Sequence, residues 1–106
     1  MYPTIHALIS VLVLGTVALA ADGPSVERGS KLFNSTSLGT NGKSCATCHP
    51  DGKGMEEVSD NDQKTTVGVV NKCIVKALKG KALADNSLEM SSLVMYMNSL
   101  GKAKDK

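Results

Sequence analysis

The sequence predicts an all-α domain, and three observations support this fold class. Apolar residues recur at helical spacing in the second half of the chain, at Val67, Val70, Ile74 and Leu78. No stretch of the chain alternates apolar and polar residues as a strand would. Residues that favour helix ends flank each helical stretch. With 106 residues, the chain has the size of a single domain.

The first helix is predicted to follow Pro24 and Ser25, which together are a turn and N-cap signal. Val26, Leu32 and Phe33 lie near one face of this helix, and Gly29 lies among them. A segment rich in Ser, Thr, Asn and Gly comes next and is expected to be a loop.

The second helix is predicted from Asn61 or Asp62 to Lys79. Asp62 is a suitable N-cap residue, and Gly80 is a suitable left-handed residue just after the helix. Cys73 falls within the apolar stripe of this helix. Because several of its residues are β-branched, its intrinsic helix propensity is low, and packing against the rest of the domain must hold it.

The third helix is predicted to start near Asn86 and Ser87, where Glu89 is placed for a capping box with Asn86. Gly101 is expected to end this helix and to leave a solvated tail. The inner face is predicted to consist of Leu93, Tyr96, Met97 and Leu100.

Residues 1–20 are predicted to be a cleaved signal peptide. The stretch from Ile5 to Ala20 is almost wholly apolar, and every Lys, Arg, Asp and Glu follows it. It has the length of a signal-peptide core, is short for a membrane span, and ends in the A-x-A pattern of Ala18 to Ala20. Because no Lys or Arg precedes it, a retained N-terminal anchor is the alternative. With either a cleaved signal peptide or a retained anchor, residues 21–106 are expected to be an exported, periplasmic domain. Only an uncleaved N-terminus would attach this domain to a membrane.

The chain has three cysteines, an odd number that does not suit a simple disulfide framework. Two of them belong to the run from Cys45 to His49, which is the C-x-x-C-H pattern of covalent haem attachment. Two thiols on one tight turn can reach the two vinyl groups of a porphyrin, and His49 then lies under the iron as the proximal ligand. The pattern predicts one haem c bound by Cys45, Cys48 and His49. A redox dithiol or half of a zinc site are alternatives, but the chain has no βαβ context and no second C-x-x-C pair.

A haem would also supply much of the missing core. After the leader, Phe33 and Tyr96 are the only aromatic residues, and so short a chain is marginal for a self-sufficient core. We therefore expect the haem-free protein to be largely unfolded. The net charge of +2 is too mild to indicate nucleic-acid binding.

With the motif placed, nearly all of the chain after residue 20 resembles a class I cytochrome c. In that family a glycine and an aromatic residue of the N-terminal helix cross a leucine and a tyrosine of the C-terminal helix, and Gly29, Phe33, Leu93 and Tyr96 match them. The resemblance implies the cytochrome c fold, with three main helices around one covalently bound haem, and a role in electron transport.

A narrower resemblance lies in the run from Val70 to Cys73, in the runs Gly80–Leu83 and Ser87–Met90, and in Tyr96. These runs are similar to the haem domains of thiosulfate dehydrogenases and of the sulfur-oxidising haem protein that works with them. This resemblance implies that Cys73 is the distal ligand of the iron.

The residues themselves leave the distal ligand open. Most class I cytochromes use a Met on the loop before the last helix, but the loop of residues 79–86 contains none, and Leu83 stands roughly in its place. A buried free cysteine is also a common small core residue, so Cys73 has a purely structural alternative. Besides Cys73, the candidate ligands are Met90, Met55, Met95 and Met97.

We expect a monomeric carrier of single electrons between periplasmic or membrane redox partners, without enzymatic activity. Six lysines could steer acidic partner surfaces, namely Lys43, Lys53, Lys72, Lys76, Lys79 and Lys81. The alternative is a haem subunit or enzyme of thiosulfate or sulfur-compound oxidation, in which Cys73 and a neighbouring lysine meet an anion at the iron. Those enzymes usually have two haem motifs and this chain has one, which favours the carrier.

Overall fold

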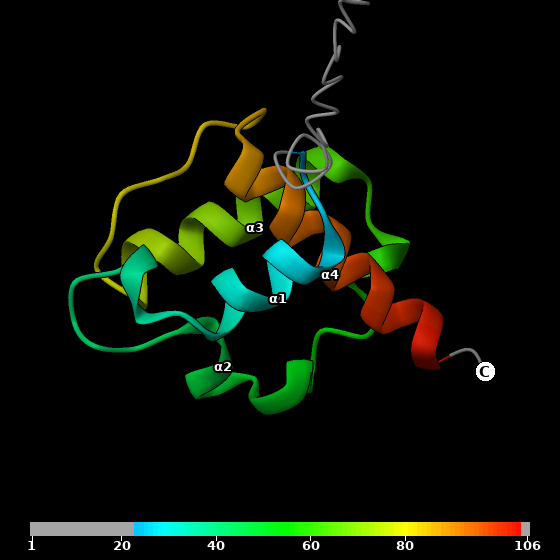
Figure 1. Cartoon of the computed structure of the whole chain (residues 1–106), viewed down its shortest axis with the longest axis horizontal. Coiled ribbons are helices and arrows are strands. Elements are labelled where there is room, and N and C mark those ends of the chain that lie inside the picture. Colours follow the sequence, from blue (N-terminus) through cyan, green and yellow to red (C-terminus); the bar gives the residue numbers. More distant parts are fainter. Residues whose placement is uncertain (1–22, 105–106) are drawn as a thin grey trace, which may run out of the picture.

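The computed structural model describes residues 23–104, which contain four α-helices, three short 3₁₀ turns and no strand (Figure 1). The helices are α1 (Val26–Asn34), α2 (Cys45–Cys48), α3 (Gln63–Lys76) and α4 (Leu88–Lys104). The all-α class is therefore confirmed for this part of the chain, with three longer helices and the single turn α2. The predicted signal peptide, residues 1–20, lies outside the described residues. No helix among residues 23–104 is long and apolar enough to cross a membrane.

Helices α1 and α4 cross in direct contact (Figure 1). Ser25 caps α1 as predicted, since its side chain accepts a hydrogen bond from the Arg28 N–H at 3.0 Å. At the crossing, a Cβ added to Gly29 would lie 2.0 Å from the Ser92 carbonyl oxygen, so only glycine permits this approach. One turn later the rings of Phe33 and Tyr96 pack with their centroids 5.2 Å apart.

Helix α3 begins as predicted and ends earlier than predicted. The Asp62 side chain accepts a hydrogen bond from the Thr65 N–H at 2.7 Å. The helix ends at Lys76, and the left-handed residue after it is Lys79, with φ of 59°, rather than Gly80. Gly80 is required for another reason, because a Cβ there would lie 2.0 Å from the Leu38 carbonyl oxygen.

Helix α4 begins where the sequence predicts, but its cap residue and its C-terminal end differ from the prediction. Its first turn is capped by Ser87, whose hydroxyl accepts a hydrogen bond from the Met90 N–H at 3.1 Å, and not by Asn86. The helix also continues through Gly101, which is buried against the segment of residues 56–59. A Cβ at Gly101 would lie 2.0 Å from the Ser59 hydroxyl oxygen, so this glycine permits a close contact rather than ending the helix.

Side chains from α1, α3 and α4 form one apolar core, to which the first cysteine of the motif also belongs. The buried set contains part of each predicted inner face, but Val26 is 42 % exposed, and Cys73, Tyr96 and Leu100 are only partly buried. The members of the buried set are Phe33, Cys45, Val67, Val70, Ile74, Leu78, Met90, Leu93, Val94 and Met97.

Candidate functional site

The two cysteines of the motif lie on one helical turn. Ser44 precedes α2, and its N–H donates a hydrogen bond to the Thr47 hydroxyl at 2.9 Å, which closes the turn. Residues three apart on a helix lie on the same side, so Cys45 and Cys48 face the same way. Cys45 is buried at its place beside the core, whereas Cys48 is exposed. The pair therefore extends from the interior to the surface.

The ring of His49 is held in a defined orientation. Its Nδ1 lies 2.9 Å from the Lys53 carbonyl oxygen. Because a carbonyl can only accept, Nδ1 must carry the proton and donate it, which leaves the lone pair of Nε2 free to bind a metal. Lys53 thus provides the backbone carbonyl that fixes the tautomer and the orientation of the ring.

The turn that brings Lys53 back to His49 depends on left-handed backbone conformations. Asp51, Gly52 and Gly54 have φ values of 55°, 76° and 90°. A Cβ on Gly54 would lie 3.3 Å from Nδ1 of His49, so the glycine also leaves room for the ring. The run from Pro50 to Gly54 therefore positions the imidazole as well as ending α2.

Cys73 lies within electrostatic reach of both motif cysteines. Burial raises the pKa of the Cys73 thiol, and the neighbouring charge of Cys48 raises it further. Burial also raises the pKa of the Cys45 thiol to about 11, with a second contribution from Cys73. The three thiols thus share one region. Within residues 23–104, however, no three His, Cys, Asp or Glu side chains gather closely enough to hold a metal ion together.

An uncovered apolar stripe runs along α3 beside Cys73. Val69, Cys73 and Ala77 are spaced four residues apart and share one helix face. Val69 is 51 % exposed, Cys73 is half-buried and Ala77 is exposed. This face of α3 therefore offers apolar contact surface beside the core.

These observations test whether the residues fit a haem, and they do. Two thiols share a turn, an imidazole beside them has a free Nε2, and the third thiol, that of Cys73, interacts electrostatically with the two motif cysteines. This donor set suits haem iron with one axial imidazole and one axial sulfur.

The methionine candidates occupy other surroundings. Met90 and Met97 are 0 % and 2 % exposed, and both belong to the apolar core. Met95 is 40 % exposed, and Met55 is partly buried against the core. Met90 and Met97 share that core with the motif residue Cys45, and Cys73 interacts electrostatically with the same cysteine, so these surroundings alone do not select one distal ligand.

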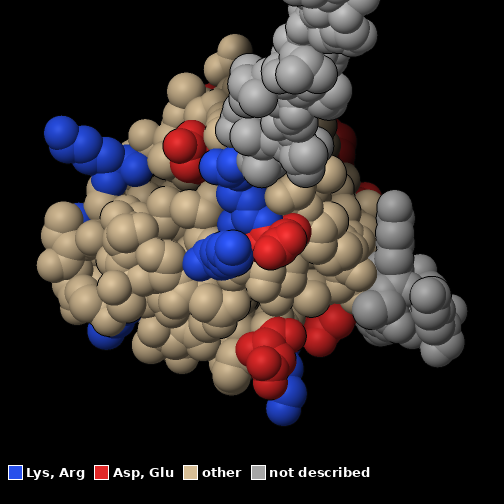
Figure 2. Space-filling view, in the orientation of Figure 1, with Lys and Arg blue, Asp and Glu red and all other residues tan. Residues whose placement is uncertain are grey.

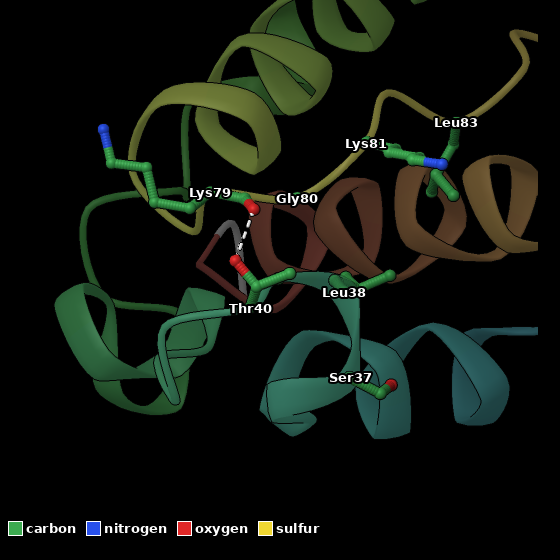
Figure 3. A pocket seen from close by; sticks show the side chains of 8 residues that line it. Ser37, Leu38, Thr40, Lys79, Gly80, Lys81 and Leu83 are labelled. Carbon is green, nitrogen blue, oxygen red and sulfur yellow. Dashed lines mark hydrogen bonds between the residues drawn. The ribbon is translucent and has the colours of Figure 1, made fainter.

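The segment before the motif is fastened to the end of α3. Asn41 donates a side-chain hydrogen bond to the Ala77 carbonyl at 2.9 Å, and the Thr40 N–H donates to the Leu78 carbonyl at 2.9 Å. The Thr40 hydroxyl donates to the Lys79 carbonyl at 2.7 Å (Figure 3). These bonds satisfy carbonyls that a helix end leaves without partners, and they join the Cys73 helix to the chain that leads into α2.

A cavity of about 430 Å³ lies beside these bonds, between the segments of residues 37–40 and 79–83. The Lys79 side chain points away from it in Figure 3. None of the four predicted site residues lines the cavity, whose lining is Ser37, Leu38, Gly39, Thr40, Lys79, Gly80, Lys81 and Leu83.

Sequence reasoning missed this fastening and also a bridge from Asn71 to Leu83. The available signals were weak: two glycines, Gly39 and Gly80, and an asparagine within a helix, where that residue type is disfavoured.

Comparison of the chain with protein-family models, curated proteins and solved structures finds no match.

Proposed function

We propose that this protein is an exported class I c-type cytochrome that carries single electrons. The observation that carries the proposal is the orientation of His49, whose Nδ1–H is held by the Lys53 carbonyl directly after two cysteines on one turn. A dithiol site would not require the imidazole, and a zinc site would use the same free nitrogen but would need further ligands, whereas no three His, Cys, Asp or Glu side chains of residues 23–104 gather closely enough to hold such an ion. The crossing of α1 and α4 at Gly29, with Phe33 against Tyr96, further supports a cytochrome c fold.

Each residue of the site has a defined task in this proposal. Cys45 and Cys48 attach the porphyrin, since each Sγ–H adds across a vinyl group and needs no oxidant. His49 ligates the iron through Nε2, while its bond to Lys53 fixes the ring and increases its basicity. The bound haem supplies the redox chemistry by cycling between ferric and ferrous iron. Val69 and Ala77 contribute apolar surface that excludes water from this region.

Cys73 is our proposed distal ligand. It comes from α3, its thiol is near those of α2, and the neighbouring stripe is uncovered. Met90 is the second candidate, but its burial in the core is the usual fate of a methionine on an inner helix face. Ligation by a thiolate instead of a thioether stabilises ferric iron and lowers the reduction potential.

The charge distribution suits an acidic redox partner. Residues 63–84 contain five lysines and no acidic residue, whereas residues 51–62 contain five acidic residues and one lysine. Acidic side chains gather at the lower edge of the face in Figure 2. Because Lys72 and Lys76 are exposed on the helix that carries Cys73, a basic surface adjoins the proposed haem site. Partner binding should therefore weaken as ionic strength rises.

The test is the purified exported protein. We expect a mass increased by one haem per chain, a thioether-type haemochrome spectrum, and a thiolate signature in electron paramagnetic resonance of the ferric form. Cys73→Ser should abolish that signature, and Met90→Leu should keep it. A colourless product or an unmodified mass would overturn the proposal as a whole. A methionine-type spectrum that survives Cys73→Ser would overturn only the distal ligand.

A second candidate function for this protein is the oxidation of a sulfur anion. It is favoured by Cys73, whose side chain is only half-buried. Lys76 lies three residues further along α3, on a neighbouring face, and could hold an anion near the sulfur. Thiosulfate-dependent reduction of the ferric protein, lost in Lys76→Gln, would favour this role. No reduction by thiosulfate would leave the protein a carrier.

A further inference from the structure

Asn71 forms a two-pronged bridge from α3 to the following loop. Its Nδ2 donates to the Leu83 carbonyl at 2.9 Å, and its Oδ1 accepts from the Leu83 N–H at 2.7 Å. Both hydrogen bonds are partly buried. The bridge needs one donor and one acceptor on a short side chain, so aspartate can supply only one of the bonds and leucine neither.

The bridge lies on the side of α3 away from Cys73. Residues two apart on a helix are separated by about 200° around its axis, so the side chains of Asn71 and Cys73 point in nearly opposite directions. Leu83 stands where the family resemblance places a methionine ligand, yet it is held on the Asn71 side and packs against the core. The loop is therefore kept off the flank that carries Cys73.

A second attachment lies close to the first along the loop. The Thr40 hydroxyl donates to the Lys79 carbonyl, and the Gly80 N–H donates to the Ile74 carbonyl at 2.8 Å. Only three residues separate the attachment at Lys79 from the bridge at Leu83 (Figure 3). So short a connection has little slack, and it restrains rotation of α3 about its own axis.

Rotation of α3 matters for a ligand to iron. A turn of about 20° moves a side-chain atom roughly 1 to 2 Å, given a Cα radius of about 2.3 Å and the added length of the side chain. Metal–ligand distances are fixed to within about 0.2 Å. A small rotation would therefore weaken coordination by Cys73 without unfolding the helix.

We infer that Asn71 is a positioning residue for Cys73: by fastening Leu83 to the opposite side of α3, it sets the rotation of the helix and keeps the Cys73 flank open to the haem. The inference rests on the proposed haem function. It assigns to Asn71 a role that neither the motif nor the apolar pattern indicates.

The test compares Asn71→Leu and Asn71→Asp with a matched control. Asn34→Leu is the control, because Asn34 is an exposed helix residue whose amide donates only to a backbone carbonyl of its own helix, that of Ser30. In the haem-loaded protein, we expect Asn71→Leu to speed hydrogen exchange at the Leu83 amide by about tenfold, which corresponds to one lost hydrogen bond. We also expect added imidazole to displace the distal ligand at roughly tenfold lower concentration. Asn71→Asp should show smaller changes of the same sign, and Asn34→Leu none.

Each result separates the two proposals. Suppose that the protein carries haem with a thiolate signature. If Asn71→Leu then speeds hydrogen exchange at the Leu83 amide but changes neither the ferric spectrum nor imidazole binding, Asn71 only fastens the loop. In that case the inference about Asn71 is wrong and the proposed function stands. Unchanged Leu83 exchange would also overturn it. A product without haem would overturn the proposed function and the inference together. If Asn71→Leu does not fold, Asn71→Asp, which keeps the acceptor for the Leu83 N–H, provides the same readouts.

Discussion

Replacing Gly29 with alanine should destabilise the protein by forcing α1 and α4 apart. The added Cβ would lie 2.0 Å from the Ser92 carbonyl oxygen and 2.7 Å from the Tyr96 Cβ, whereas ordinary contacts begin at 3.4 Å. The helices must therefore separate locally by about 1.4 Å, because the nearest atoms belong to backbone and cannot rotate away.

The magnitude follows from three contributions. Overpacking of this kind costs about 1 to 3 kcal/mol. Loosening the contact between Phe33 and Tyr96 adds roughly 1 kcal/mol. The better helix propensity of alanine returns about 1 kcal/mol. The net loss is about 2 kcal/mol, which for a domain of this size lowers the melting temperature by roughly 8 to 16 °C.

Gly68→Ala is the matched control. Gly68 also lies within a helix, but a Cβ there would meet no atom within 4 Å. We expect this variant to gain about 0.5 to 1 kcal/mol from helix propensity alone. Melting followed by circular dichroism should therefore shift in opposite directions for the two variants. If Gly29→Ala melts at or above the temperature of the unmodified protein, the close crossing of α1 and α4 is wrong.

Three further predictions concern the rest of the domain. Gly80→Ala should cost about 1 to 3 kcal/mol in chemical denaturation, because its Cβ would meet a backbone carbonyl at 2.0 Å; an unchanged midpoint would contradict the contact. The hydrogen bond from Thr65 lowers the pKa of the Asp62 carboxyl below its ordinary value of 3.8. The stability that this carboxylate contributes is therefore present above pH 3.8 and is lost as the pH falls through the lowered pKa. Asp62→Asn should accordingly lose less stability than the unmodified protein between about pH 5 and pH 2. The double variant Cys45→Ser/Cys48→Ser should lose most of its helical circular dichroism, because haem burial contributes on the order of 10 kcal/mol at most; a native-like spectrum would show that the apolar core suffices without haem.

The parts of the fold that the sequence predicts are those set by local chemistry. Ser25 and Asp62 cap helices because a side-chain oxygen two or three residues before a free N–H is a short-range feature. The centre of each helix face also follows from the 3.6-residue period, whereas the predicted face residues Val26, Cys73 and Leu100 remain partly or largely exposed. The geometry at His49 is local as well, with its acceptor four residues away.

The parts that it does not predict depend on segments distant in the chain. Gly80 and Gly101 stand where the sequence predicts helix ends, yet each glycine is needed for a close contact. Gly80 lies against Leu38, and Gly101 lies against Ser59. Which of the two roles a glycine takes depends on what lies opposite it in space, and the local sequence does not contain that information. Lys79 takes the left-handed conformation at the C-terminal turn of α3, which the Gly80 N–H closes by donating to the Ile74 carbonyl at 2.8 Å.

The same distinction explains why the distal ligand is harder to predict than the proximal one. Cys45, Cys48 and His49 are positioned by a single turn, so their spacing alone encodes the geometry. Cys73, the proposed distal ligand, belongs to α3, and polar contacts hold the end of this helix through Asn71 to Leu83 and through Thr40 to Lys79. In our proposal, ligation by Cys73 therefore depends on these polar attachments as much as on the cysteine itself. A chain that kept the cysteine but lost the attachments would retain the motif and the haem, and would coordinate its distal ligand weakly.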